Sequence, residues 1–164
     1  MKDLLDKLGS YNLFNYLLPG VVFAALAGSL TRYSFIQSDL IVGAFVYYFL
    51  GLVISRIGSM FVEPALKRVK FVEFCSYQDY VSASKEDDLI QTLSESNNMY
   101  RTFISLFLCL LLLKLFELIA VKLLLVEELK ISVLVIGLFF LFLMSYRKQT
   151  AYINKRVQHK LPKH

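Results

Sequence analysis

Lys114 and Glu117 are the two charged residues within the most apolar stretch of this chain, Phe103–Val121. Residues three positions apart lie on one face of a helix, so this ammonium and carboxylate can neutralise each other. An ionisable side chain inside a bilayer is costly and commonly marks a functional site. Two interpretations follow. The pair lines a polar seam or pore between helices or subunits, or its lysine extends outward and the pair only sets the depth of the helix.

The sequence contains none of the motifs of the common enzyme classes. It has no glycine-rich nucleotide loop, no HExxH metal motif and no GxSxG nucleophile motif. His159 and His164 lie in a basic terminal segment, whose lysines repel metal cations. Cys75 and Cys109 form neither a CxxC pair nor a disulfide framework, so we expect two reduced thiols. We therefore predict a protein that is not an enzyme and that binds no metal or cofactor.

Apolar residues are arranged in four blocks. The chain has 164 residues and is 57% hydrophobic, whereas soluble domains are about 45–50% apolar. As a helix, the most apolar block alone would extend about 28 Å, close to the thickness of a bilayer's hydrocarbon core. We therefore predict an all-α polytopic membrane protein with four transmembrane helices; the alternative is that the first two blocks form a re-entrant hairpin. The four blocks are Tyr16–Leu30, Leu40–Met60, Phe103–Val121 and Ile131–Tyr146.

Positive charges predict the orientation. The segment between the second and third spans has more Lys and Arg than either of the other two loops, and the tail has six cations and no acid. Because cytoplasmic loops are enriched in these residues, we predict that both termini and the long central segment lie in the cytoplasm. We expect the tail to form a basic helix on anionic lipid of the inner leaflet, and we do not expect it to bind nucleic acid. The tail cations are Arg147, Lys148, Lys155, Arg156, Lys160 and Lys163.

This topology divides the chain into four parts. Residues 1–62 hold an N-terminal interfacial helix and spans one and two, and residues 63–102 form a short cytoplasmic helical hairpin. Residues 103–146 hold spans three and four, and residues 147–164 form the basic tail. We expect a cytosolic protein partner to bind at residues 63–102.

Local signals predict the helix boundaries of the central segment. The dipeptide Glu63-Pro64 predicts a helix boundary, because proline disfavours helical geometry in the residue before it. Ser84–Asp87 resembles a capping box. No Gly or Pro interrupts the sequence from Glu86 to Lys130, so the third span is predicted to be the membrane part of a helix that begins in the cytoplasm.

Small residues recur every four positions on the first two spans. Such stripes allow two helices to approach closely, so we expect these spans to pack together or to form a subunit interface in a homo-oligomer. Pro19 predicts a kink or a late helix start in the first span. Arg56 is predicted to anchor the second span at the inner face, or to pair with Glu63 or Glu95. The stripes are Gly20, Ala24 and Gly28 on the first span and Gly51, Ser55 and Ser59 on the second.

Three short runs, Asn12–Gly20, Gly51–Ser59 and Asn97–Arg101, carry a resemblance. They resemble small bacterial four-span inner-membrane proteins of the kind found beside phage-defence genes. The resemblance implies a membrane protein that acts as a sensor or as a membrane-disrupting effector with a cytosolic partner. We therefore expect an oligomeric membrane effector or a pore or sensor subunit. The alternative is a scaffold that recruits a cytosolic protein without conducting ions.

Overall fold

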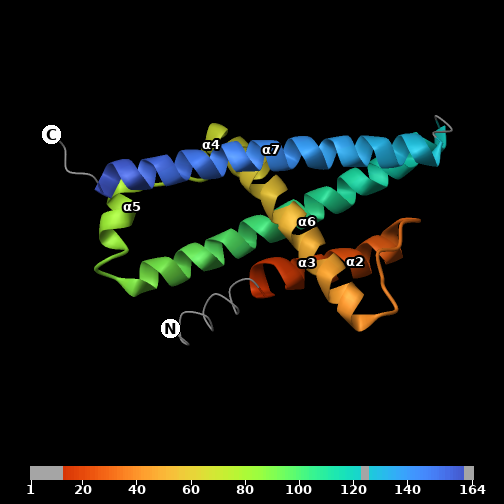
Figure 1. The fold of residues 1–164 in the computed structure, drawn as a ribbon, viewed down its shortest axis with the longest axis horizontal. Helices are drawn as coiled ribbons and strands as arrows, with labels where there is room; N and C mark the ends of the chain where they lie inside the picture. Colours follow the sequence, from red (N-terminus) through yellow and green to blue (C-terminus); the bar gives the residue numbers. More distant parts are fainter. Residues whose placement is uncertain (1–12, 123–125, 161–164) are drawn as a thin grey trace.

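The computed structural model describes residues 13–122 and 126–160. All regular structure in these residues is helical, and Figure 1 shows how the helices are arranged. The predicted interfacial helix at the N-terminus and the tail residue Lys163 lie outside the described residues. The elements are the π-helical turns η1 (Leu13–Leu17) and η2 (Gly58–Val62) and the helices α2 (Leu18–Leu30), α3 (Leu40–Ile57), α4 (Glu63–Arg68), α5 (Tyr77–Ala83), α6 (Asp88–Lys122) and α7 (Glu127–Lys160).

Within the described residues, three helices are long and apolar enough to cross a membrane. They are α6, α7 and the continuous helix Leu40–Arg68, which α3, η2 and α4 form together. Their lateral surfaces carry exposed apolar side chains such as Phe45, Leu111 and Phe139. The all-α class is therefore confirmed, and the three long helices are compatible with a multi-pass membrane protein. The first apolar segment forms a shorter helix, Asn15–Leu30, so four full spans do not follow from helix length.

The first two apolar segments pack with their backbones in contact. Gly20 of α2 lies against the backbone of Tyr47, and Gly51 of α3 lies against the backbone of Tyr16. Neither glycine has a Cβ, so the two helices can approach more closely than any pair of larger residues would allow. α6 packs beside this crossing and completes a small apolar core that contains Phe23, Ala27, Ile54, Leu106 and Leu110.

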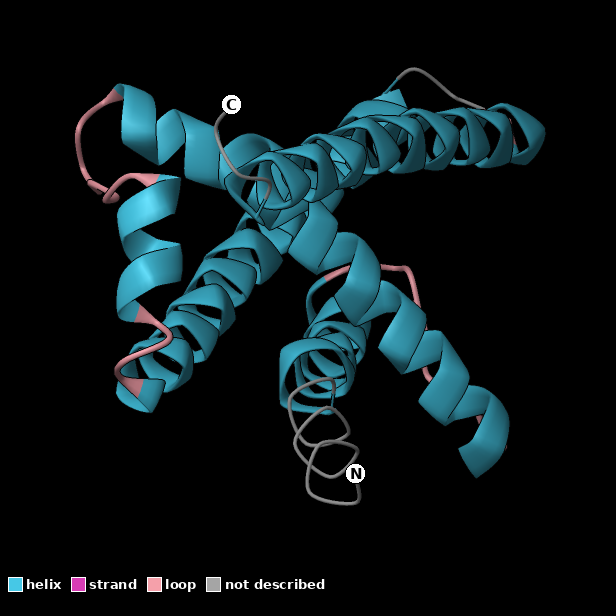
Figure 2. Cartoon of the chain, turned by 60° about the vertical axis from the view of Figure 1, so that its left-hand side comes forward, coloured by secondary structure: helices cyan, strands magenta, loops and turns pink. Residues whose placement is uncertain are grey.

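The two longest helices form a V. α6 and α7 come together at their Lys122 and Glu127 ends and diverge toward their opposite ends (Figure 1). α7 packs mainly against α3, where Phe49 and Phe142 stack with their ring centroids 6.2 Å apart. Loops join α2 to α3, α4 to α5 and α5 to α6 and are drawn in pink in Figure 2.

Two predicted helix boundaries differ from the structure. The helix does not stop at Pro64. Proline normally disrupts a helix because it lacks an N–H and its ring crowds the carbonyl four residues earlier. Here the π-helical turn η2 lies immediately before Pro64 and changes the spacing of these carbonyls, so the helix continues. The helix ends at Arg68, after which Lys70 adopts a left-handed conformation with φ of 57°. Ser84 terminates α5, and the side chain of Asp87 accepts the N–H of Leu89 at 2.8 Å at the start of α6.

The prediction of one helix that joins a polar half to an apolar half is confirmed. α6 begins at Asp88 and continues through the apolar stretch to Lys122 without interruption. α7 has the reverse order, with its apolar half first and the basic segment continuing as helix to Lys160. The polar halves, Asp88–Arg101 and Arg147–Lys160, would each extend about 21 Å at a rise of about 1.5 Å per residue.

Candidate functional site

Charged side chains gather at two places where the long helices meet other elements. One group, the Glu117 cluster, consists of Arg32, Lys114 and Glu117. The other, the Glu63 cluster, lies where α3 and α4 meet α6 and α7. The Glu63 cluster is defined by Arg56, Ser59, Glu63, Lys67, Arg101 and Lys148.

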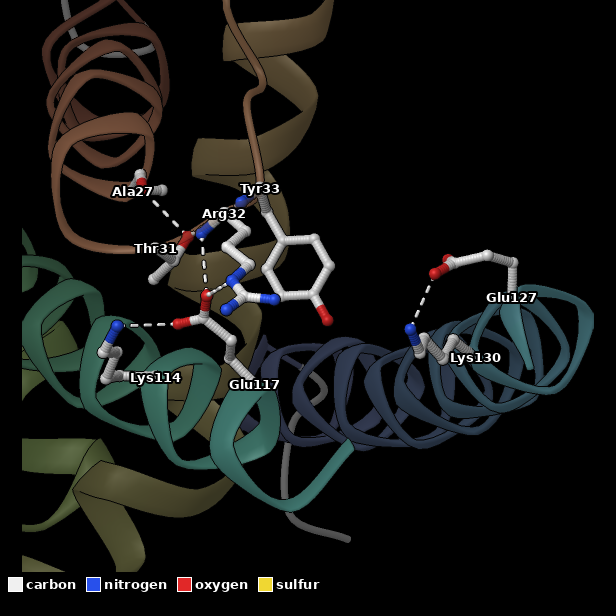
Figure 3. A network of polar contacts seen from close by, with 8 residues as sticks. All are labelled: Ala27, Thr31, Arg32, Tyr33, Lys114, Glu117, Glu127 and Lys130. Atoms are coloured by element: carbon white, nitrogen blue, oxygen red, sulfur yellow. Dashed lines mark hydrogen bonds and ion pairs between the residues drawn. The ribbon is translucent and has the colours of Figure 1, made fainter. Parts of the chain in front are cut away.

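The carboxylate of Glu117 is enclosed by donors from two elements. Its Oε2 accepts a hydrogen bond from Lys114 Nζ at 2.7 Å. Its Oε1 accepts the backbone N–H of Arg32 at 3.1 Å and lies 3.4 Å from the Nε of the same arginine (Figure 3). The side chain of Glu117 is only 7% exposed, whereas those of Lys114 and Arg32 are 49% and 78% exposed. A buried carboxylate thus connects α6 to the loop after α2.

The end of α2 positions Arg32 for this contact. Thr31 leaves the helix in an extended conformation, and its hydroxyl donates to the carbonyl of Ala27 at 2.8 Å. The same hydroxyl accepts the N–H of Tyr33 at 3.1 Å. These bonds fix the loop on both sides of Arg32, so its backbone N–H lies beside Glu117 (Figure 3). A hydrogen bond to a charged acceptor is stronger than one between neutral groups.

A second ion pair near the turn into α7 has the same spacing but a different environment. Lys130 Nζ lies 2.7 Å from Glu127 Oε1, also three residues apart. Glu127 is 77% exposed, in contrast to Glu117. Tyr33 lies between the two ion pairs in Figure 3. Its ring packs against that of Phe116, with the ring centroids 6.4 Å apart. The Glu127–Lys130 pair is therefore a natural comparison for the Glu117 cluster.

The Glu63 cluster joins three helices. Glu63 pairs with Lys67 of α4 at 3.0 Å and with Arg101 of α6 at 2.5 Å. Lys148 of α7 donates from its Nζ to the backbone carbonyl of Ser59 at 2.5 Å and to the Ser59 hydroxyl oxygen at 2.7 Å. Glu63 is thus the carboxylate that binds two of the cations, while Lys148 is held by neutral oxygens.

Small and hydroxylated residues allow α6 to approach α3 beside this cluster. The hydroxyl of Ser105 donates to the carbonyl of Ile54 at 2.9 Å, and the hydroxyl oxygens of Thr102 and Ser55 lie 3.4 Å apart. A Cβ placed on Gly58 would lie 3.3 Å from the Cβ of Ser105. Serine and threonine commonly join apolar helices in this way.

The two predicted small-residue stripes have mixed environments. Gly20, Ala24 and Gly51 are buried at or near the α2–α3 crossing. Gly28 of the first stripe differs from these residues. It lies on the exposed side of α2, and a Cβ there would meet only Ile36 at 3.8 Å. Ser55 and Ser59 of the second stripe form hydrogen bonds to α6 and α7.

The predicted inner-face cations also differ in environment. Arg56 is half-buried and forms no ion pair with Glu63 or Glu95, because Glu63 binds Arg101 and Lys67 instead. Lys148 is half-buried in the Glu63 cluster. The other described tail cations are exposed and extend along α7: Arg147, Lys155, Arg156 and Lys160.

Sequence reasoning placed Lys114 beside Glu117 but did not assign Arg32 to the pair. The signal that could have found it is that Arg32 is the one cation between the first two apolar segments. Within residues 13–122 and 126–160, no three His, Cys, Asp or Glu side chains gather in a group that could hold a metal ion. Comparisons with protein-family models, curated proteins and solved structures find no match for this chain.

Proposed function

We propose that this chain is a non-enzymatic, multi-pass protein of the bacterial inner membrane that acts as an oligomeric effector, pore or sensor subunit with a cytosolic partner. The observation that carries the proposal is the form of α6 and α7. Each is one helix with an apolar half and a polar half, and the two polar halves diverge on the same side of the molecule (Figure 1). A signal bound between the polar halves could thus alter the membrane halves through continuous helices.

The spacing of charges supports a membrane location. Leu40–Ser55 of α3 and Ile131–Tyr146 of α7 contain no charged residue. Each interval would extend about 24 Å, somewhat less than a typical hydrocarbon core of about 30 Å. On α6 the uncharged interval between Arg101 and Lys114 is shorter, and the Glu63 and Glu117 clusters lie at its two ends. We assign the Glu63 cluster to the cytoplasmic face, together with the polar halves of α6 and α7, and include the shorter helix Asn15–Leu30 as a fourth membrane segment.

The Glu117 cluster bears on the choice between an effector and a scaffold. Both oxygens of Glu117 are bound within the chain, so this carboxylate offers little to a pore lining. That closed arrangement favours the second candidate, a scaffold that recruits a cytosolic protein without conducting ions. The exposed ammonium of Lys114 favours the effector, because it is available to a second copy of the chain.

Ion conductance should separate the two candidates. We expect the purified protein, reconstituted in liposomes, to release an ionic dye in proportion to its oligomeric fraction. The matched control is a Gly51→Leu variant at equal abundance in the membrane, whose helix crossing cannot form. Absence of leakage from wild-type oligomers, with retention of a cytosolic partner, would favour the scaffold.

The sequence resemblance implies a role in phage defence. That role is tested separately, by phage infection of cells that express the protein.

Cys75 allows the proposed orientation to be tested with a native residue. It is exposed in the α4–α5 loop, whereas Cys109 lies within the apolar half of α6. In a Cys109→Ser background, we expect an impermeant maleimide to label Cys75 only after the cells are opened. A cysteine introduced at Glu127 should be labelled in intact cells, because that residue is exposed at the opposite end of the long helices. The reverse labelling pattern would contradict the orientation.

A further inference from the structure

Positive charge exceeds negative charge in the Glu63 cluster. Arg56, Lys67 and Arg101 all lie near enough to Lys148 for their charges to repel its ammonium group, and Glu63 is the acid that attracts it. Both oxygens of this acid already bind Lys67 and Arg101. The cluster thus contains four cations and one carboxylate where three helices meet, and only two of the cations bind that carboxylate. Like charges held together in this way raise the local affinity for an anion.

Lys148 and Arg101 are partly buried, and acidic groups do not fully balance the positive charge around them. Lys148 donates to the carbonyl and hydroxyl oxygens of Ser59, and it forms no ion pair within the described part of the chain. These neutral oxygens accept hydrogen bonds from two of its three N–H groups but do not balance its charge. The side chain of Arg101 is 21% exposed, and its Nε is buried without a hydrogen-bond partner among the described residues. Both side chains therefore favour an additional acceptor that carries negative charge.

The cluster lies where the uncharged intervals of the three long helices end. Arg56 directly follows the uncharged residues 40–55 of α3, and Arg101 directly precedes the uncharged residues 102–113 of α6. Lys148 is the second residue after the uncharged residues 131–146 of α7. In the membrane orientation proposed above, this level is that of the lipid phosphates at the cytoplasmic surface, where anionic lipids attract Lys and Arg. Guanidinium groups bind phosphate oxygens through two parallel hydrogen bonds, and ammonium groups bind them as point charges.

We propose that the Glu63 cluster binds the phosphate group of an anionic phospholipid at the junction of α4, α6 and α7. Lys148 and Arg101 form the inner side of this site, and Lys67 and Arg56 form its more accessible side. The bound phosphate balances the charge that Glu63 leaves uncompensated and joins α7 to the other two helices. The proposal rests on the proposed membrane location, and it concerns a headgroup site within the helix junction, distinct from the exposed cations along the tail.

Thermal melting of the full-length protein in neutral detergent tests the site separately from conductance and orientation. The probes are phosphatidylglycerol, phosphatidylcholine with the same acyl chains, and inorganic phosphate. We expect phosphatidylglycerol to raise the melting temperature with a saturable midpoint and phosphatidylcholine to leave it unchanged. Inorganic phosphate should have little effect, because it lacks the acyl chains that hold a lipid at this level. An equal rise with inorganic phosphate would overturn the lipid assignment in favour of a free-anion site.

Two double variants with the same change in charge locate the effect. Arg56→Gln with Lys67→Gln removes two cations from the accessible side of the cluster, and we expect the midpoint for phosphatidylglycerol to rise about tenfold or more. Lys155→Gln with Arg156→Gln removes two exposed tail cations that lie outside the cluster. These cations are expected to associate with anionic lipid along the tail, so this variant should change the midpoint much less than the first. Equal losses in the two double variants would contradict a defined site, as would an unchanged midpoint in the first.

A third variant changes the charge in the opposite direction. Glu63→Gln removes the one acid, so the protein without lipid should melt at a lower temperature than wild type. Phosphatidylglycerol should then raise the melting temperature by more than it does for wild type, because it replaces the missing negative charge. A smaller rise than that of wild type would show that Glu63 helps to bind the lipid rather than competing with it, and would overturn the proposal.

Discussion

Alanine at Gly20 or Gly51 should disrupt the crossing of α2 and α3. A Cβ on Gly20 would lie 1.7 Å from the carbonyl oxygen of Tyr47, and a Cβ on Gly51 would lie 1.7 Å from that of Tyr16. Both obstructing atoms belong to the backbone, so no change of rotamer relieves the clash and the helices must separate. We expect a loss of about 3 kcal/mol or more in the free energy of unfolding. Thermal melting in detergent should show a fall of about 6–12 °C.

Gly137 provides the matched control for these substitutions. It lies in the apolar half of α7, and a Cβ there would meet nothing within 4 Å. Alanine is the better helix former by about 1 kcal/mol, so Gly137→Ala should melt at the wild-type temperature or above it. If Gly20→Ala and Gly51→Ala melted in the same range as Gly137→Ala, the close crossing would not exist in the folded protein.

The long helices could be predicted because their signals are local. The absence of Gly and Pro from Glu86 to Lys130 predicted an uninterrupted helix, and α6 confirms this from Asp88 to Lys122. Pro64 gave the wrong boundary because one π-helical turn before it lets the helix continue. The first apolar block, Tyr16–Leu30, is short for a full span in the sequence as well, and the helix formed there, Asn15–Leu30, is shorter than the other three.

The candidate site could be predicted only in part, for a related reason. Lys114 and Glu117 are three residues apart, so helix geometry alone brings them together. Arg32 is 85 residues from Glu117 in sequence, and Lys148 is 89 residues from Ser59. Contacts of this kind depend on which helix faces meet, and apolar helices of similar composition can meet in many ways. The Arg32 contact and the junction around Glu63 therefore required the structure.

Arg32, the third member of the Glu117 cluster, bears on the two interpretations of Lys114 and Glu117, which are a polar seam or pore lining and a pair that only sets the depth of the helix. A pair that only set the depth of α6 would need no contact with another element. The carboxylate instead binds the loop after α2 through a backbone N–H and a guanidinium group. Its burial also differs from that of Glu127, which forms the same type of pair in an exposed position. We infer that Glu117 holds the α2–α3 loop against α6.

Glu117→Gln should therefore lower the melting temperature much more than Glu127→Gln does. Glutamine keeps the size of the side chain and an oxygen for the Arg32 N–H, but it removes the charge that both cations share. The Glu127 carboxylate is 77% exposed, although Lys130 is 18% exposed, so loss of this pair should change the melting temperature much less.

Arg32→Gln should distinguish a contact between elements from a depth signal on α6. If Glu117 holds the loop, Arg32→Gln should also lower the melting temperature, and the double variant with Glu117→Gln should melt close to the less stable single variant, since both remove one shared interaction. If the pair lines a pore instead, Glu117→Gln should change the leakage of liposomes while its melting temperature stays at that of Glu127→Gln. That second result would refute the structural role inferred for Glu117, because a carboxylate that connects two elements cannot lose its charge without a change in stability.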